Sequence, residues 1–418
     1  MSKKHVLCIL IAVFTVGSSQ AQNLIPGLTG SGSEDDPVLL ATADDLRILS
    51  AFVMNDADYS TATANKHFKL TNDISFGEPC YDFDGDGIME SNFIPVGGRS
   101  DTSVYSNYRL FQGYFHGEGH VISGVRIIYN GVPYVGIFGV TWGATIEKVG
   151  VLSGSFWGYG CVGGLCGQAN SGTVIRDSYV SNSVIVSDYW MAGGFVGATY
   201  SNSIVNNCYV TTTSVSGTDW VGGFCGNNNG SSAINNSYSV AIVMTVYNNF
   251  NLYGGFCGSN PEGSVIDNCY YQDMWQYSTD VEPNPSAEYG TPLTGSEMQS
   301  VWFMEQLNAS QIPAPWALSP NQNYGYPILS WQISNEVSVN DIHRDGVSVY
   351  PNPTADKLFI NTASANPLTV TLYDLYGRIL MSYEGINTLD ISALAKGVYM
   401  LSVRESGNTI LNRTIIKQ

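Results

Sequence analysis

Short apolar runs alternate with glycine, asparagine and serine along the middle of this chain, and the alternation recurs at a regular spacing. A glycine-rich block ends in turn at Gly139, Gly167, Gly197, Gly226 and Gly258, which lie 28 to 32 residues apart. A second block follows each time, as in the run from Ile204 to Tyr209. Short runs rich in β-branched and aromatic residues predict strands rather than helices. The period over residues 135–271 therefore predicts stacked copies of one supersecondary unit.

We predict an all-β fold in which each repeat forms one coil of a β-solenoid. A single repeat cannot bury its apolar side, whereas stacked coils can. Adjacent strands lie about 4.8 Å apart, so five coils would span about 25 Å. Because side chains alternate along a strand, Val205, Asn207 and Tyr209 would share one face. A polar ladder would then connect successive coils through Asp177, Asn207, Asn236 and Asn268. The handedness and the strand pairing stay open.

The repeats resemble the GLUG family of bacterial surface proteins. The resemblance rests on Gly-Gly-Phe-Cys-Gly at 222–226 and 254–258 and on Asn-Cys-Tyr at 207–209 and 268–270. It extends upstream through segments at 67–74, 93–97 and 115–124, and covers roughly residues 29–331. The resemblance implies a solenoid on a bacterial surface, and its motifs specify architecture rather than function.

Small helical caps are expected at both ends of the solenoid. A helix is predicted from Ala43 to Val53, with Thr42 and Asp45 in a capping box. Its apolar residues fall on one face, so residues 22–134 would form an N-terminal cap and the first coils. In residues 272–331 a short helix is predicted from Thr294 to Leu307. The aromatic residues that follow it, up to Trp331, would plug the second open end.

The last part of the chain forms a separate domain. Residues 332–346 are polar and predict a linker, and residues 347–418 show short alternating strands typical of a small Ig-like β-sandwich. This domain resembles the type A C-terminal sorting domain of the type IX secretion system of the Bacteroidetes. The matching residues are Pro351, Asn352, Pro353, Gly377, Gly397, Tyr399, Val403 and Lys417. The resemblance implies export by the type IX machinery and removal of the domain by a surface sortase.

The first 21 residues predict a secretory signal peptide. Two lysines precede an apolar core from Val6 to Val16, and cleavage is expected between Ala21 and Gln22. A transmembrane anchor is the alternative, but about eleven apolar residues are too few to span a bilayer. No later segment is apolar enough to cross a membrane. We therefore expect a secreted or outer-membrane surface protein, either anchored or released.

Charge and cysteine usage limit the choice of partners. The net charge is −18 with 17 Lys and Arg residues, and none of these lies between Arg176 and Arg344. Such a chain is a poor nucleic-acid binder, because phosphate contacts need basic side chains. Seven of the eight cysteines follow the signal peptide, and five of them alternate with Val196, Ser178 and Ser237 at two repeat positions. Small interchangeable residues indicate packing rather than disulfides or zinc.

One loop has the pattern of a calcium ligand set. Asp82, Asp84 and Asp86 occupy the first, third and fifth positions of a calcium loop, and Glu90 could add a fourth carboxylate. The match then fails, because the twelfth position is Phe93. Structural Ca²⁺ and a solvated acidic turn both fit this pattern. No other cofactor is expected.

Aromatic residues near the glycine pairs suggest a binding surface. Tyr159, Trp190, Trp220 and Tyr253 each precede a glycine pair by one to four residues. If these turns stack, the rings form a stripe that would bind a glycan or a host or matrix protein. The alternative is that the rings pack on one another at a solenoid corner.

The enzyme hypothesis has little support in the repeats. Solenoids often carry polysaccharide lyases and hydrolases, but residues 177–331 contain no Lys, Arg or His and no motif pairs their aspartates. His116 and His120 fall inside the family-like segment and are interpreted as structural. We therefore expect no catalytic residues and a non-enzymatic, adhesive repeat protein. A polysaccharide-degrading enzyme and a passive surface or matrix protein are the alternatives.

Overall fold

The structure is a computed structural model of the chain. It describes residues 23–55, 61–79, 90–99, 108–245, 252–273, 289–309, 311–319, 322–333, 348–350, 354–361, 366–374, 378–405 and 408–417. Both residues of the expected signal-cleavage site, Ala21 and Gln22, lie outside these ranges. Among the described helices, none combines the length and apolar character that a membrane crossing requires.

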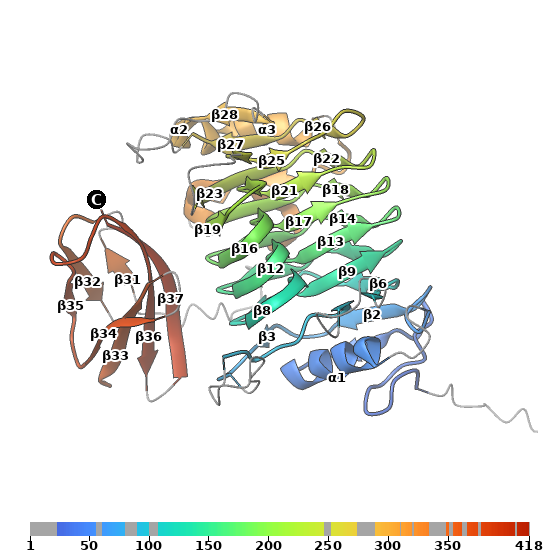
Figure 1. The fold of residues 1–418 in the computed structure, drawn as a ribbon, viewed down its shortest axis with the longest axis horizontal. Coiled ribbons are helices and arrows are strands. Elements are labelled where there is room, and N and C mark those ends of the chain that lie inside the picture. The colour runs from blue at the N-terminus through green and yellow to red at the C-terminus, as the bar shows by residue number, and fades with distance from the viewer. Residues whose placement is uncertain are drawn as a thin grey trace, which may run out of the picture.

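The repeats form a β-solenoid, as predicted, and Figure 1 shows its coils stacked on one another. One coil runs through β10 (Thr145–Glu147), β11 (Gly150–Leu152), β12 (Ser155–Gly163) and β13 (Cys166–Asn170). Equivalent strands of successive coils pair in parallel, so that Ile146 lies opposite Ile175 in the next coil. Parallel pairing at every step places each repeat position in a column along the solenoid.

Three sheets enclose the core. The first has eight strands: β1 (Val38–Leu40), β2 (His67–Leu70), β6 (Tyr114–His116), β10, β14 (Val174–Arg176), β18 (Ile204–Asn206), β22 (Ala233–Asn235) and β26 (Val265–Asp267). The second has thirteen: β3 (Ile74–Ser75), β7 (Val121–Ser123), β8 (Arg126–Val135), β11, β12, β15 (Tyr179–Ser181), β16 (Val184–Gly193), β19 (Tyr209–Gly217), β20 (Val221–Gly222), β23 (Tyr238–Thr245), β24 (Tyr253–Gly254), β27 (Tyr270–Gln272) and β28 (Thr291–Leu293). The third has five: β9 (Phe138–Trp142), β13, β17 (Val196–Thr199), β21 (Cys225–Asn228) and β25 (Cys257–Ser259). A short pair, β4 (Gly98–Arg99) and β5 (Tyr108–Arg109), lies beside the early coils.

The glycine blocks allow neighbouring backbones to approach closely inside the solenoid. A Cβ atom on Gly222 would lie 1.9 Å from the carbonyl oxygen of Cys225, so a side chain is excluded there. The aromatic residue of the same block points inward, and Phe195, Phe224 and Phe256 stack at 4.9 and 4.8 Å between centroids. Glycine thus leaves the room that the buried phenylalanine column fills.

The predicted shared face of Val205, Asn207 and Tyr209 is wrong, because the chain turns between them. Asn207 has a left-handed backbone with a φ of 52°, which ends β18 and redirects the chain into β19. Val205 therefore lies in the core, whereas Tyr209 lies on the outer side under the C-terminal tail. Asparagine and aspartate suit this corner because they tolerate a left-handed backbone.

The predicted polar ladder is present, except that the hydrogen bond between Asn207 and Asn236 is replaced by one between Asn206 and Asn236. Asn207 donates to the Asp177 carboxylate at 3.1 Å, and Asn268 donates to the Asn236 side chain at 2.8 Å. Asn236, however, donates to Asn206 at 3.0 Å rather than to Asn207. Asn207 is already engaged with Gln311 of the tail, through two hydrogen bonds of 3.1 and 3.2 Å. The tail therefore replaces one rung of the predicted ladder.

The N-terminal helix is confirmed as α1 (Ala43–Met54), with the capping box of Thr42 and Asp45 in place. Its residues Leu46, Leu49 and Val53 are buried in the solenoid core cluster. Figure 1 shows α1 beside the first coils.

The C-terminal tail does not plug the second end with its aromatic residues. It contains α2 (Gly295–Met298), α3 (Val301–Asn308), β29 (Trp316–Ala317), a 3₁₀ turn (Asn323–Gly325), β30 (Ile328–Leu329) and α4 (Ser330–Ile333). The predicted helix is thus divided in two, because Ser300 caps a second helix. Trp316 packs on the outer face of the second sheet, against Tyr209 and Tyr238 at 6.0 and 5.5 Å. The tail therefore covers the side of several coils.

The final domain is a two-sheet β-sandwich, consistent with the predicted Ig-like fold. One sheet contains β31 (Ser348–Tyr350), β32 (Lys357–Asn361) and β35 (Thr388–Asp390). The other contains β34 (Ile379–Glu384), β33 (Leu368–Tyr373), β36 (Gly397–Glu405) and β37 (Asn408–Lys417). Val403 is part of its buried core, and the Tyr399 hydroxyl donates to the Ala395 carbonyl oxygen at 2.7 Å. Lys417 donates to the carbonyl oxygen of Ala355. The motif residues Pro351, Asn352, Pro353 and Gly377 lie outside the described residues.

Candidate functional site

Exposed aromatic rings gather on the outer side of two neighbouring coils. Tyr159 in β12 and Tyr189 in β16 stack with 5.1 Å between ring centroids and 5° between ring planes. Trp190 lies beside them, at 63° to Tyr189 with 4.9 Å between centroids. Tyr159 is 38% exposed and Tyr189 is 52% exposed. We call Tyr159, Tyr189 and Trp190 the aromatic ledge.

A β-bulge positions the ledge. Gly158 pairs with Ser187 and Gly160 pairs with Trp190, so one residue of β12 opposes two residues of β16. A bulge bends the strand and turns side chains outward, which explains the exposure of Asp188 and Tyr189. Trp190 can lie against the preceding coil because Gly160 has no side chain. A Cβ atom at Gly160 would be 2.2 Å from the indole nitrogen of Trp190.

Only part of the predicted aromatic stripe is present. Tyr253 is 3% exposed and belongs to the solenoid core, so it is no binding residue. Trp190 and Trp220 are both half-buried against the small cluster formed by Cys161, Met191 and Ala198, but only Trp190 also contacts the exposed tyrosines, at 4.9 Å from Tyr189. These differences arise because the four rings occupy different columns: Tyr253 pairs with Val221, whereas Trp190 pairs with Gly160.

The sequence interpretation missed Tyr189. The glycine blocks that follow Tyr159 and Tyr189 end at Gly167 and Gly197, which are 30 residues apart, and the two tyrosines have the same separation. Aligning each repeat with the next by their glycine blocks therefore places Tyr159 opposite Tyr189. The stacking of the two rings follows from that register.

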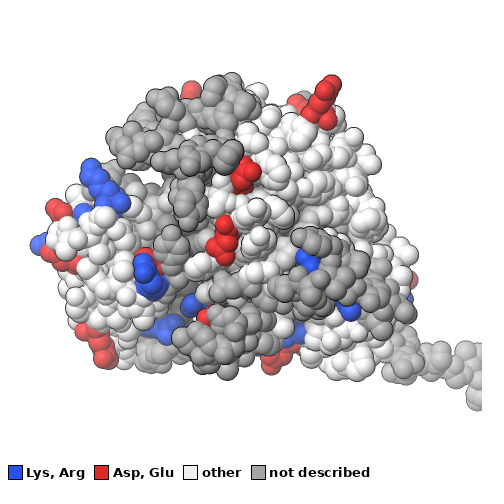
Figure 2. Space-filling view, in the orientation of Figure 1, with Lys and Arg blue, Asp and Glu red and all other residues white. Residues whose placement is uncertain are grey.

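Two carboxylates accompany the ledge. Asp188 accepts a hydrogen bond from the indole nitrogen of Trp157 at 2.7 Å, and Asp219 accepts one from the backbone amide of Trp220 at 3.0 Å. Burial raises the pKa of both carboxyl groups above the usual range, and these hydrogen bonds oppose the rise. Figure 2 shows acidic but no basic side chains among the described residues of the upper coils on the face drawn. The repeat that contributes Asp188, Tyr189 and Trp190 belongs to the run between Arg176 and Arg344, which contains no Lys or Arg.

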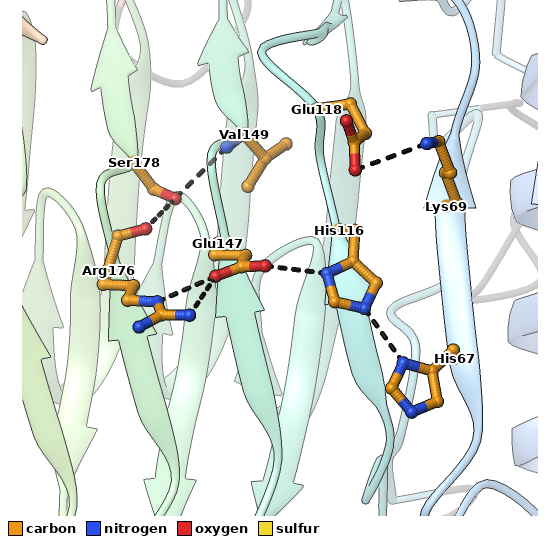
Figure 3. A network of polar contacts seen from close by, with 8 residues as sticks. All are labelled: His67, Lys69, His116, Glu118, Glu147, Val149, Arg176 and Ser178. Carbon is orange, nitrogen blue, oxygen red and sulfur yellow. Dashed lines mark hydrogen bonds and ion pairs between the residues drawn. The ribbon is translucent and has the colours of Figure 1, made fainter. Parts of the chain in front are cut away.

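A second polar constellation lies on the first sheet and is shown in Figure 3. The Nδ1 atom of His67 lies 3.0 Å from Nε2 of His116, and Nδ1 of His116 lies 2.7 Å from the Glu147 carboxylate. Arg176 binds the other oxygen of Glu147, with its Nε atom at 2.8 Å. The four residues come from β2, β6, β10 and β14, so the row connects four successive strands of the first sheet.

The electrostatics of this row fit a structural connection. Partial burial would raise the pKa of the Glu147 carboxyl, but hydrogen bonds from His116 and Arg176 outweigh it and keep that pKa below its usual value. Burial, followed by the charge of His116, lowers the pKa of His67. Glu147 is thus held ionised between two partners. His120 pairs with a different carboxylate, that of Asp73, at 3.0 Å.

The predicted calcium loop falls largely outside the described residues. Asp82, Asp84 and Asp86 are not among them, and a calcium site there stays a prediction. Glu90 is described; burial lowers the pKa of the Arg126 guanidinium, and the charge of Glu90 is among the contributions that oppose this shift. In the described part of the chain no group of three or more His, Cys, Asp or Glu residues is arranged to hold a metal.

All six described cysteines are free and buried, as expected for packing residues. Ser178, Cys208, Ser237 and Cys269 occupy one column and each donates to the carbonyl oxygen two residues before it, at 2.8, 3.2, 2.7 and 3.2 Å. Burial raises the pKa of the Cys161 and Cys166 thiols to about 12, which keeps them protonated.

The C-terminal domain matches a known family. The family model described as a secretion system C-terminal sorting domain covers residues 348–417, which correspond to the sandwich. The chain therefore carries a type IX secretion sorting domain, and this indicates export by that machinery and attachment at the cell surface.

The chain also has more distant similarities. The chain is 25% identical over 194 residues to halomucin of Haloquadratum walsbyi, a match that covers 40% of this chain and 2% of halomucin. It also resembles a crystal structure from Bacteroides ovatus described as a candidate immunoglobulin A1 protease. That match has a TM-score of 0.48 and 18% identity, and it covers 72% of this chain and 94% of the other.

Proposed function

We propose that the protein is a non-enzymatic adhesin of the cell surface or the secreted fraction, and that its solenoid binds a glycan at the aromatic ledge. The observation that carries the proposal is the stacked, exposed pair of Tyr159 and Tyr189 flanked by Trp190. The GLUG-like repeats and the type IX sorting domain support a role outside the cell.

The chemistry of the ledge suits a sugar. Tyrosine and tryptophan present an apolar ring together with a polar group, and they are common where one surface must contact apolar and polar parts of a ligand. Contiguous exposed aromatic residues mark interaction sites more often than isolated ones. Both tyrosines lie on strands of a rigid sheet, so binding would order little of the protein.

The proposal is non-enzymatic because the described titratable clusters are engaged in structural contacts. Glu147 is occupied on both oxygens, by His116 and Arg176, on the outer face of the first sheet. Asp188 beside the ledge is held by Trp157. Hydrolysis of a glycan would need two carboxylates placed on either side of the scissile bond. A polysaccharide-degrading enzyme remains the competing function.

A glycan array tests this function, with the full secreted chain as the probe and product release measured on each hit. Binding without turnover is expected. The double variant Tyr159→Ala/Tyr189→Ala should lose binding, whereas Trp142→Ala should keep it. Trp142 is a matched control because it is 47% exposed and lies in β9, in a different sheet. Turnover would favour the enzyme, and the absence of any hit would favour a passive surface protein.

A further inference from the structure

The tyrosine stack on the ledge ends abruptly at the next coil. β16 and β20 come from successive coils, and Ala192 of β16 pairs with Val221 of β20. Tyr189 and Thr218 each lie three residues before this pair, so Thr218 corresponds to Tyr189 in the next coil. The Thr218 hydroxyl donates a hydrogen bond to the carbonyl oxygen of Tyr189, which places it directly beside that residue. A third ring would be expected here if the stack continued, but the side chain is small.

Another ladder of the same molecule shows what a continued stack looks like. Tyr179, Tyr209 and Tyr238 come from three successive coils and stack at 4.9 and 5.3 Å with 3° between ring planes. Tyr209 and Tyr238 are at most 1% exposed, because rings and tail cover them. Tyr189, in contrast, is 52% exposed. Tyr159 stacks on one face of its ring, and among the described residues no ring stacks on the other face.

The position opposite Tyr189 in the coil of Thr218, where a third ring of the stack would lie, is called the open rung. Tyr159 and Tyr189 stack at about the spacing of the strands, so their rings are stacked along the solenoid axis. The face of the Tyr189 ring opposite Tyr159 is therefore turned toward the coil of Thr218. Trp190 stands at 63° beside Tyr189. Asp188 precedes Tyr189 in the chain and Asp219 follows Thr218, so an acidic residue adjoins each of these two positions in the sequence.

We propose that this rung, between Tyr189 and Thr218, is a subsite for one pyranose ring of a glycan without acidic groups. The inference rests on the proposed glycan binding and assigns it a place and a ligand class. A pyranose has an apolar face of C–H groups that stacks on an aromatic ring, and its hydroxyls can donate to carboxylates.

The acidic composition of these coils disfavours acidic glycans. The chain has a net charge of −18, and Tyr189 and Thr218 lie in the run of 167 residues between Arg176 and Arg344 that contains no Lys or Arg, so a uronate or a sulfate would be repelled by acidic side chains such as the exposed Asp188. A neutral ring has no such penalty. The subsite therefore selects against anionic sugars through repulsion, in addition to stacking.

The test fills the rung with a side chain of the protein itself. Thr218→Tyr places a ring against Tyr189, and binding of neutral oligosaccharides should weaken at least tenfold. Thr218→Ser keeps the hydroxyl and leaves the rung open, so it should bind like the wild type. The probes are neutral glucan, mannan and N-acetylglucosamine oligomers, with oligogalacturonate and heparin fragments as acidic counterparts, and the full secreted chain is used throughout.

Each result is decisive. Unchanged binding by a folded Thr218→Tyr variant overturns the subsite while leaving glycan binding elsewhere on the ledge intact. Preference for the acidic probes overturns the ligand class. If the wild type binds no probe, the proposed function itself fails, and the subsite fails with it. Thr218→Leu fills the same space without a ring, and it replaces Thr218→Tyr if circular dichroism shows that the tyrosine variant is unfolded.

Discussion

At the scale of single residues, the ledge depends on a small residue facing a large one. Trp190 lies where Gly160 of the preceding coil leaves space, and Asp188 and Tyr189 are exposed by the bulge opposite Tyr159. The ring positions are therefore determined by which residue the neighbouring coil supplies. A change in a residue that touches no ligand can thus move the ledge.

Gly160→Ala should destabilise the solenoid and weaken glycan binding. The new Cβ would lie 2.2 Å from the Trp190 indole, and such overpacking costs about 1–3 kcal/mol. Urea unfolding measures the free energy of unfolding of the wild type, Gly160→Ala, Trp190→Ala and the double variant, which together form a double-mutant cycle. In a Trp190→Ala background the same Gly160→Ala change should cost much less, because the clashing atoms are gone. Equal costs in both backgrounds would show that the clash is not with Trp190.

At the scale of elements, hydrogen bonds between side chains and backbone join successive coils at their corners. Ser237 donates to the Asn235 carbonyl oxygen at 2.7 Å and accepts from the amide of Cys208 in the preceding coil at 3.1 Å. Ser178 does the same for Val149. Cysteine takes this position in other coils because its thiol can still donate weakly and is small enough to be buried.

Ser237→Ala should cost about 1–3 kcal/mol, because a buried amide and a buried carbonyl lose their partner. Ser237→Cys should cost less, since Cys208 and Cys269 already occupy the equivalent positions. Thermal unfolding ranks the two variants, and amide hydrogen exchange at Cys208 reports the lost bond directly. Equal stability of the alanine and cysteine variants would contradict the role given to the hydroxyl.

At the scale of the whole molecule, the solenoid and the sorting domain have separate cores and separate roles. The tail continues the second sheet with β28 and then, from Gly295 to Ile333, packs on the outer face of that sheet. It is joined to the coils by contacts such as the hydrogen bond from the Trp331 indole to the Asp177 carbonyl oxygen at 2.9 Å. The sandwich buries its own apolar cluster. The function of the domain can therefore be removed without opening the solenoid.

Deleting residues 348–418 should prevent surface display in a bacterium with a type IX secretion system. The matched sorting family covers this segment, and the solenoid core has no residue in it. Immunoblots of surface, medium and periplasmic fractions measure the outcome, and the full chain with Tyr159→Ala is the control, because it should still be exported. Surface display of the deleted chain would mean that another segment directs export.

Much of the architecture could be predicted from sequence. The repeat period, the inward phenylalanines and the capping box of α1 depend on local spacing and residue type, so the coils and the first helix were predicted. The corner after β18 depends on the left-handed backbone of Asn207, whose φ of 52° the alternation rule does not include, and Lys148 and Asp177 have the same conformation at the equivalent corners of earlier coils. The assignment of Tyr209 to the face of Val205 failed for that reason. Tyr253 failed as a ledge residue because its column points into the core.

The sequence by itself determined the solenoid, the buried cysteine columns, the acidic repeats without basic residues and the sorting domain, because each follows from periodicity, composition or a local motif. Only the tertiary structure decided which rings are exposed, since exposure depends on the register between coils and on the bulge at Tyr189. It also decided that aromatic residues of the tail such as Trp316 and Trp331 lie on a flank, because that packing joins residues as far apart as Asp177 and Trp331. Such contacts arise from packing between distant segments, and no local pattern in the chain specifies them.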